Sequence, residues 1–170
     1  MQQRSSRKAT RPPKPAVGAL DAGLRLLARR AHARAELRTK LKRRGHSGED
    51  VERALGRLAE LGYLDDSSFA EGHVRRRQAA LGPLALSREL ASRGVDRAVT
   101  ESALARFDTA AQLASATRLA ERLCARSPSP GYREMLNTVG AKLLRRGFTP
   151  AVARAACLAA WRGAQPDPEA

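Results

Sequence analysis

Apolar residues recur every three or four positions along almost the whole chain from Val17 onward, which is the period of an α-helix with one buried face. Leucine and alanine supply most of these positions, as at Leu24, Leu27, Ala28 and Ala31. No stretch shows the strict alternation of a strand, and runs of β-branched or aromatic residues are missing. The pattern therefore predicts an all-α protein.

Three glycines mark expected helix ends. Gly45, Gly94 and Gly147 each follow one or two arginines, and a glycine just beyond a last turn that carries cations is typical of a helix C-terminus. Two residues after each glycine stands a side chain with an oxygen that can cap the next helix. These predicted capping residues are Ser47, Asp96 and Thr149.

The glycine breaks repeat at spacings of 49 and 53 residues, and leucine lies four residues before each of them. A period in this range indicates an array of helical units. We expect three tandem three-helix repeats that form an elongated, curved helical array. The expected helices are 17–31, 33–44 and 48–61, then 66–80, 83–93 and 97–106, then 109–126, 131–146 and 150–162.

The same breaks divide the chain into five segments. Residues 1–16 are basic and contain three prolines, so we expect a disordered basic arm. The helical repeats are expected at 17–62, 63–107 and 108–162, and a disordered tail at 163–170.

Composition narrows the class of protein. Of the 170 residues 42% are apolar, but no apolar stretch approaches the roughly 18 residues that a membrane span needs. No continuous apolar segment follows the basic N-terminus, so a secretory signal is not expected. Two cysteines are too few for a disulfide framework. We expect a cytoplasmic protein and, because no heptad seam is present, a monomer.

No catalytic or metal-binding pattern emerges. The three histidines and two cysteines lack the spacing of metal ligands, and the glycines match neither phosphate-binding nor dinucleotide-binding loops. His73 is interpreted as a packed histidine and Cys157 as a core residue. A nuclease would need a carboxylate cluster that the sequence does not assemble. We expect no enzyme activity, no catalytic residue, no cofactor and no metal.

Charge is distributed unevenly along the chain. There are 32 Lys and Arg against 17 Asp and Glu, for a net charge of +15, and residues 1–44 alone carry +12. Such an excess favours a polyanion or an acidic protein face as partner, although a solubilising tail is an alternative. Like charges four residues apart, such as Arg38 and Lys42, oppose helix formation unless a partner neutralises them. The candidate partner-binding residues are Arg34, Arg38, Lys40, Lys42, Arg75 and Arg76.

Four segments resemble the RecX family in the family's order. The most specific is LAELGYLDDSSFA at residues 58–70, and the resemblance covers about residues 19–161. The weaker segments are 26–30 with 34–41 at the start, 81–83 with 89–90 and 93–95 in the middle, and 144–148 near the end.

The resemblance implies a bacterial regulator of the RecA recombinase with three tandem three-helix repeats. It implies binding to the RecA–DNA filament, which would block filament extension and recombinase activity in DNA repair and the SOS response, without catalysis or a cofactor. The chain departs from the family pattern at Ala33, where serine is usual, and at Leu81 and Leu84, where basic residues are common. The leucines at positions 81 and 84 leave fewer basic side chains on the surface of the middle repeat.

A helical protein that binds DNA directly, without RecA, is the alternative. Glycine-containing turns between helices are compatible with helix-turn-helix binding, although no helix shows the Asn, Gln and Arg pattern that reads base edges. Single- or double-stranded DNA is therefore the second candidate partner. Binding through phosphates alone would weaken steeply with salt, whereas binding to a filament would require RecA.

Overall fold

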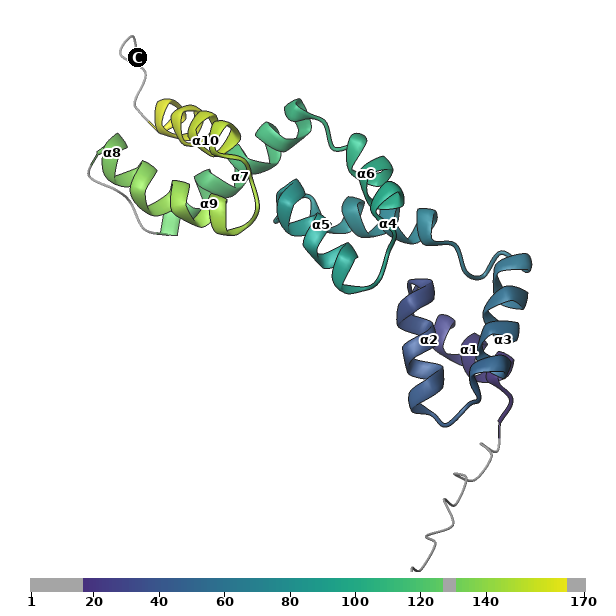
Figure 1. Cartoon of the computed structure of the whole chain (residues 1–170). Helices are drawn as coiled ribbons and strands as arrows, with labels where there is room; N and C mark the ends of the chain where they lie inside the picture. Colours follow the sequence, from purple (N-terminus) through teal and green to yellow (C-terminus); the bar gives the residue numbers. More distant parts are fainter. Residues whose placement is uncertain (1–16, 127–130, 165–170) are drawn as a thin grey trace, which may run out of the picture. The chain divides into compact units, whose positions relative to one another are not determined.

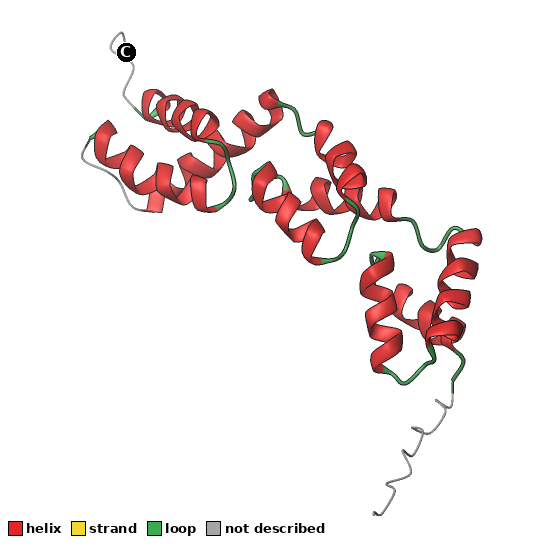
Figure 2. Cartoon of the chain, in the orientation of Figure 1, coloured by secondary structure: helices red, strands yellow, loops and turns green. Residues whose placement is uncertain are grey.

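The structure, a computed structural model, describes residues 17–126 and 131–164 and contains only helices and connecting turns over those ranges (Figures 1 and 2). The predicted all-α class is confirmed. The helices α8 and α9 form one continuous helix through a π-helical turn, η1. The bounds are α1 (Ala19–Leu27), α2 (Arg34–Arg43), α3 (Gly48–Glu60), α4 (Asp66–Arg77), α5 (Pro83–Ser92), α6 (Arg97–Ala105), α7 (Thr109–Arg126), α8 (Tyr132–Met135), η1 (Leu136–Gly140), α9 (Ala141–Arg145) and α10 (Pro150–Gly163).

The chain divides into two compact units, the first ending at Asp65 and the second beginning at Asp66. The first unit contains α1, α2 and α3, and the second contains all later helices. The boundaries of the three individual repeats stay a prediction. The predicted basic arm at 1–16 lies outside the described residues, as does all but the start of the predicted tail, whose first residue, Gly163, ends α10.

The three predicted glycine breaks end their helices in the same way. Gly45, Gly94 and Gly147 have φ angles of 86°, 74° and 84°, in the left-handed region that glycine adopts without steric cost. The amide after each glycine donates to a carbonyl five residues earlier, which is the hydrogen bond of a Schellman turn. These bonds run from His46 to Leu41 (3.4 Å), from Val95 to Leu90 (3.1 Å) and from Phe148 to Leu143 (3.2 Å). Gly62, which the sequence argument did not single out, ends α3 with φ 74°.

The three predicted capping residues are also confirmed. Each accepts a hydrogen bond from a backbone amide in the first turn of its helix, and such a bond contributes about 1 kcal/mol to stability. The capping bonds run from Asp50 N–H to Ser47 Oγ (3.1 Å), from Ala98 N–H to Asp96 Oδ1 (2.8 Å) and from Val152 N–H to Thr149 Oγ1 (3.3 Å).

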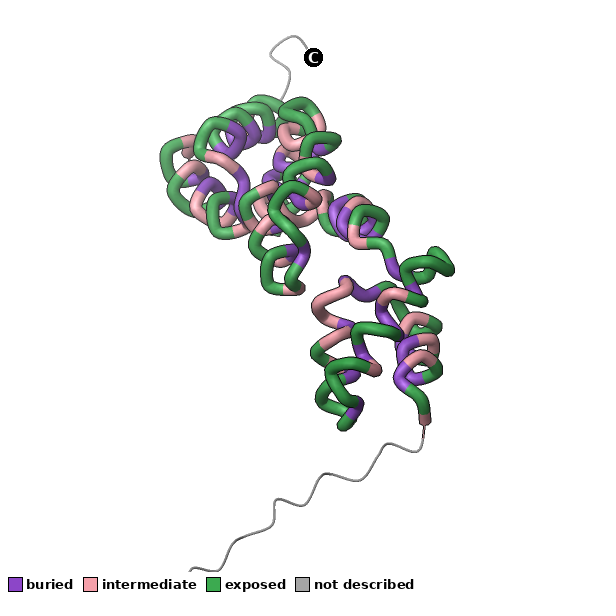
Figure 3. The backbone as a smooth tube through the Cα atoms, turned by 45° about the vertical axis from the view of Figure 1, so that its right-hand side comes forward, coloured by how far each residue is buried: buried purple, intermediate pink, exposed green. Residues whose placement is uncertain are grey.

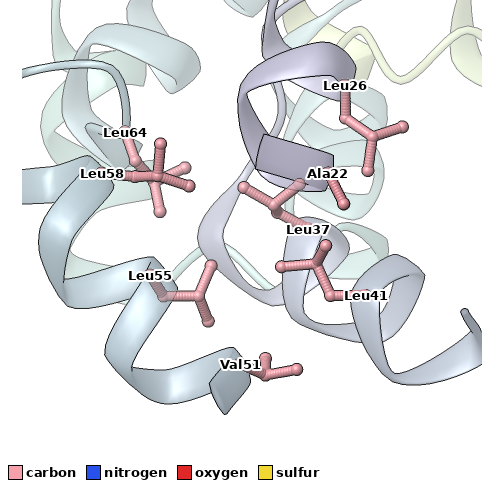
Figure 4. Close-up of a cluster of buried hydrophobic side chains, with 8 residues drawn as sticks. All are labelled: Ala22, Leu26, Leu37, Leu41, Val51, Leu55, Leu58 and Leu64. Carbon is pink, nitrogen blue, oxygen red and sulfur yellow. The ribbon is translucent and has the colours of Figure 1, made fainter. Parts of the chain in front are cut away.

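Equivalent positions before each glycine fill the core. Leu41, Leu90 and Leu143, each four residues before its glycine, have no exposed surface. Buried positions recur about once per turn of most helices, with exposed positions between them (Figure 3), although the first and last turns of α7 contain no buried residue. In the first unit the buried side chains of all three helices converge on one cluster (Figure 4). Its members are Ala22, Leu26, Leu37, Leu41, Val51, Leu55, Leu58 and Leu64.

Two helices end earlier than predicted. α1 ends at Leu27 and α4 ends at Arg77, whereas the sequence pattern extended them to residues 31 and 80. The helix that follows each of them begins from an extended residue, Ala33 (φ −70°, ψ 152°) before α2 and Gly82 (φ −82°, ψ 171°) before α5. The chain must leave the helix a few residues earlier to reach that extended conformation, and apolar periodicity does not report this requirement.

The second unit contains a close backbone contact between the start of α5 and the glycine turn after α9. The Gly82 amide donates to the Arg146 carbonyl (2.8 Å), and the Leu84 amide donates to the Gly147 carbonyl (3.1 Å). A Cβ atom on Gly82 would lie 2.4 Å from the Gly147 backbone, and one on Gly147 would lie 2.3 Å from the Ala85 nitrogen. Because both distances are far below van der Waals contact, this approach requires glycine on both sides.

We predict that Gly82→Ala destabilises the second unit. The added methyl group collides with backbone rather than with a flexible side chain, so we expect a loss of about 1–3 kcal/mol in the free energy of unfolding, as for overpacked cores. Urea denaturation followed by circular dichroism measures it.

Gly163→Ala is the matched control, because a Cβ atom at Gly163 meets nothing within 4 Å. Its unfolding midpoint should match that of the unaltered chain. Equal midpoints for both variants would contradict the close contact.

Candidate partner-binding surface

The six predicted partner-binding residues lie on two helices, one in each unit. Arg34, Arg38, Lys40 and Lys42 are on α2 of the first unit. Arg75 and Arg76 are in the last turn of α4 in the second unit. The structure therefore brings four of them together on one helix and the other two together on another, and each group is considered by itself.

Arg38 already has an intramolecular partner. Its Nε and Nη2 atoms donate to the two carboxylate oxygens of Glu52 on α3, at 2.6 Å and 2.9 Å. The Arg38 hydrogen bond lowers the pKa of Glu52. The neighbouring helix therefore supplies a carboxylate for Arg38, so its charge does not by itself require an external partner, and binding of a partner by Arg38 stays a prediction. The interaction joins α2 to α3 and orients the guanidinium group.

Glu36 is the centre of a second charge cluster that the sequence argument missed. Its carboxylate accepts a hydrogen bond from Arg30, and its Oε1 atom lies 3.3 Å from Lys40 Nζ and 3.1 Å from His32 Nδ1. Burial acts to raise the pKa of Glu36, but the hydrogen bonds from Arg30 and Lys40 and the charge of His32 outweigh it and lower the pKa to about 2. The four-residue spacing of His32, Glu36 and Lys40 in the sequence could have predicted this cluster.

The burial of His32 lowers its pKa, although Glu36 opposes the shift. The imidazole is 3% exposed and belongs to the core of the first unit. A buried, predominantly neutral histidine next to Glu36 contributes packing rather than charge near neutral pH.

The end of α2 carries three exposed cations. Lys42, Arg43 and Arg44 are exposed and make no ion pair with any residue that the structure describes. Their position in the last turn and at the C-cap complements the helix dipole. Of the four predicted residues on α2, Lys42 is exposed and forms no ion pair with a described residue, although its charge helps to lower the pKa of Glu52.

Arg75 and Arg76 are the corresponding exposed cations of the second unit. Both are exposed, and neither forms an ion pair within the described residues. Arg75 borders a shallow concavity of about 180 Å³ that also includes Val74, Gln78 and Phe107. Arg76 lies across Gly72, since its Nη1 atom is 3.0 Å from where a Cβ atom would stand.

The next arginine along α4 is used internally. Arg77 donates to Glu89 on α5 (2.8 Å), and His73 Nε2 lies 2.7 Å from the other oxygen of the same carboxylate. The hydrogen bond from Arg77 lowers the pKa of Glu89, against the effect of burial. His73 is buried and stacks on Phe69 with ring centroids 6.2 Å apart, which confirms that it is a packed histidine.

The surface offers charge rather than reactive groups. Over residues 17–126 and 131–164, no three His, Cys, Asp or Glu side chains gather in a way that could hold a metal ion. Cys157 is fully buried, as predicted, and its burial raises the pKa of the thiol to about 11. Among the described helices, none is both long and apolar enough to cross a lipid bilayer.

Two family models match the chain, and each of them covers one triplet of helices. Residues 19–58 match the model described as RecX, first three-helix domain, and residues 65–104 match RecX, second three-helix domain. The first match covers α1 to most of α3, and the second covers α4 to most of α6.

Curated relatives extend the similarity over most of the chain. Regulatory protein RecX of Halorhodospira halophila is 44% identical over 143 residues, which covers 82% of this chain and 86% of the relative. Regulatory protein RecX of Mycolicibacterium smegmatis is 40% identical over 136 residues, covering 76% and 72%. The crystal structure of RecX from Lactobacillus salivarius matches with a TM-score of 0.77 at 24% identity, over 85% of this chain and 95% of that one, and so shows the same fold.

We predict a pH-dependent effect for Glu36→Gln. The folded pKa of about 2 lies below the ordinary value of 4.5, so the carboxylate stabilises the first unit fully above about pH 4.5 and progressively less as the pH falls toward 2. The variant should lose about 1–3 kcal/mol in the free energy of unfolding near neutral pH. The difference in the free energy of unfolding between the variant and the unaltered chain should become smaller as the pH falls.

Urea denaturation at a series of pH values measures this difference. Glu60→Gln is the control, because its exposed pair with Arg57 should contribute only about 0–1 kcal/mol. A Glu36→Gln effect that stays constant from neutral pH to pH 2 would contradict the assignment.

Proposed function

Since the chain belongs to the RecX family of regulatory proteins, which are not enzymes, we propose that it regulates the RecA recombinase. The protein binds the filament that RecA forms on DNA and inhibits it. Binding blocks extension of the filament and its recombinase activity, and so limits homologous recombination in DNA repair and the SOS response.

The observation that carries this proposal is the presence, in both units, of exposed cations that form no ion pair with any described residue. Lys42 in the first unit and Arg75 and Arg76 in the second make no ion pair within the described residues. An unpaired surface cation is available to an acidic protein face or a phosphate, whereas a paired one must first give up its partner. The filament presents both kinds of anionic group, protein carboxylates and DNA phosphates.

The candidate residues divide into two roles. Lys42, Arg75 and Arg76 contact the filament directly. Arg38 and Lys40 contribute by holding α2 through Glu52 and Glu36, so substituting them perturbs the helix as well as its charge. Arg34, the first residue of α2, is proposed as a contact on its position alone.

The test is ATP hydrolysis by RecA on single-stranded DNA while this protein is titrated. Suppression at far fewer than one molecule per RecA monomer supports a regulator that acts on filament growth. An unchanged rate with RecA of the same organism and a folded sample would contradict the proposal.

We predict that the double variant Arg75→Ala/Arg76→Ala needs about three- to tenfold more protein for half-inhibition. Two exposed cations that contact a partner contribute about 0–1 kcal/mol each. The same hydrolysis assay measures the shift, and circular dichroism verifies the fold.

The control is Arg53→Ala/Arg57→Ala, which removes two exposed cations of the first unit. Both of these arginines are already paired, Arg53 with Glu49 (2.6 Å) and Arg57 with Glu60 (3.0 Å). The control should inhibit like the unaltered chain. If both double variants weaken inhibition equally, net charge rather than these positions is responsible.

A further inference from the structure

The two cysteines of the chain lie on helices that pack against each other. Cys124 stands near the end of α7 and is partly buried, whereas Cys157 stands in the middle of α10 and has no exposed surface. α7 packs chiefly against α10 (Figure 1). Both thiols are free, and the proposed regulation of RecA uses neither of them.

Small side chains line the contact between α7 and α10. Cys124 lies four residues after Ala120, and Cys157 lies four residues after Ala153, so each cysteine continues a helix face that holds a buried alanine. The buried small residues of the two helices are Ser115, Ala116, Ala120, Ala153, Ala156 and Ala160.

Small residues at a helix contact let the two backbones approach closely. Packed helix axes are about 8–10 Å apart, and Cα atoms lie about 2.3 Å from each axis, so facing Cα atoms stand about 3–5 Å apart at the closest point. A disulfide joins Cα atoms that are about 4.4–6.8 Å apart. The contact between α7 and α10 therefore offers the separation that a disulfide needs.

Residues 140–142 lie beside both cysteines. A Cβ atom on Gly140 would stand 3.8 Å from Cys157 Sγ. Burial raises the pKa of the Cys124 thiol, while the charge of Lys142 acts to lower it. Burial and, to a smaller extent, Cys124 raise the pKa of the Cys157 thiol to about 11. Since such charge effects act chiefly over about 4–6 Å, the two sulfur atoms are neighbours at the same level of the helix pair.

We propose that Cys124 and Cys157 form a reversible disulfide bond when the chain meets hydrogen peroxide, and that this bond ties α7 to α10. Pairs of thiols that change between the reduced and the disulfide form are typical of redox-responsive sites. This inference does not rest on the proposed regulation of RecA.

The reaction begins at Cys124, because its sulfur is on the partly exposed side chain and peroxide is small enough to reach it. The Cys124 thiolate attacks one peroxide oxygen, the O–O bond breaks, and the leaving hydroxide takes up a proton to become water. Cys124 is then a sulfenic acid. The Cys157 sulfur attacks the Cys124 sulfur, the S–O bond breaks, and hydroxide leaves with the proton of Cys157 as a second water. Two thiols are oxidised to one disulfide, and one peroxide is reduced to two waters.

The disulfide would stabilise the part of the second unit that it encloses. It closes a loop that contains α8, η1 and α9, and a cross-link restricts the unfolded chain more than the folded one. The raised pKa of Cys124 keeps the thiolate scarce near neutral pH, so the first step is slow and becomes faster as the pH rises.

The experiment treats the folded full chain with hydrogen peroxide, then unfolds it, alkylates the remaining thiols and measures the intact mass. The product should carry no alkyl group, should be lighter than the reduced chain by two hydrogen atoms, and should yield a linked peptide pair that contains Cys124 and Cys157. Trp161 is the only tryptophan and lies on α10, so its fluorescence reports unfolding beside the bond. Its thermal midpoint should rise by about 5–10 °C and fall back when dithiothreitol reduces the bond.

Cys124→Ala is the control, because the side chain is partly exposed and alanine leaves the buried Cys157 in place. After the same treatment Cys157 should still accept one alkyl group, and the thermal midpoint should not change with peroxide. Cys157→Ala is the second variant. It should stop at the sulfenic acid of Cys124, which dimedone captures. The comparison with Cys124→Ala remains decisive if Cys157→Ala fails to fold.

Three outcomes would overturn the proposal. Alkylation of both thiols in the peroxide-treated chain would place the two sulfur atoms too far apart to react. A disulfide that only links two chains, seen as a dimer on a non-reducing gel, would identify Cys124 as an isolated surface thiol. A Cys124–Cys157 bond that forms in urea but not in the folded chain would show that folding separates the two residues. None of these outcomes depends on inhibition of RecA.

Discussion

The structure depends on a left-handed glycine turn between the second and third helices of each triplet. A side chain at φ near +80° would cost about 1–2 kcal/mol, and the turn also brings a buried leucine against the residue after the glycine. At Gly147 the turn has a second role, because its carbonyl accepts the Leu84 amide in the first turn of α5. The end of one helix thereby caps the start of another.

The use of charge differs between the parts of the chain. In α1 to α6 many arginines join one helix to the next, as Arg38 does with Glu52, Arg77 with Glu89 and Arg106 with Glu71. Over residues 109–126 and 131–164 no cation joins two helices through an ion pair, although Arg146 Nη1 donates to the Ala80 carbonyl (3.4 Å). Ion pairs that link the first six helices thus neutralise some of their cations, whereas the cations of the last helices form no ion pair with a described residue. Several weak contacts spread over one surface raise affinity together when they are linked.

Most of the fold could be predicted from the sequence because its signals are local. Gly45, Gly94 and Gly147, with the caps at Ser47, Asp96 and Thr149, place helix boundaries through hydrogen bonds that span two to five residues. The prediction was wrong at the ends of α1 and α4, where the conformation of the next helix start decides the boundary. The π-turn at Leu136–Gly140 was missed for a similar reason, since one extra residue in a turn leaves no mark in an apolar pattern.

By itself the sequence determined the helical class, the glycine turns, the buried leucines and the family. Only the tertiary structure decided which cations are free. The carboxylate that neutralises Arg38 lies 14 residues away, and the one that neutralises Arg106 lies 35 residues away. Charge counted along the chain therefore pointed to the first 44 residues, but pairing across helices engages Arg38 there, whereas Arg75 and Arg76 form no ion pair with any described residue. Helix signals act within a few residues, but an ion pair requires two side chains that packing has placed within about 4 Å.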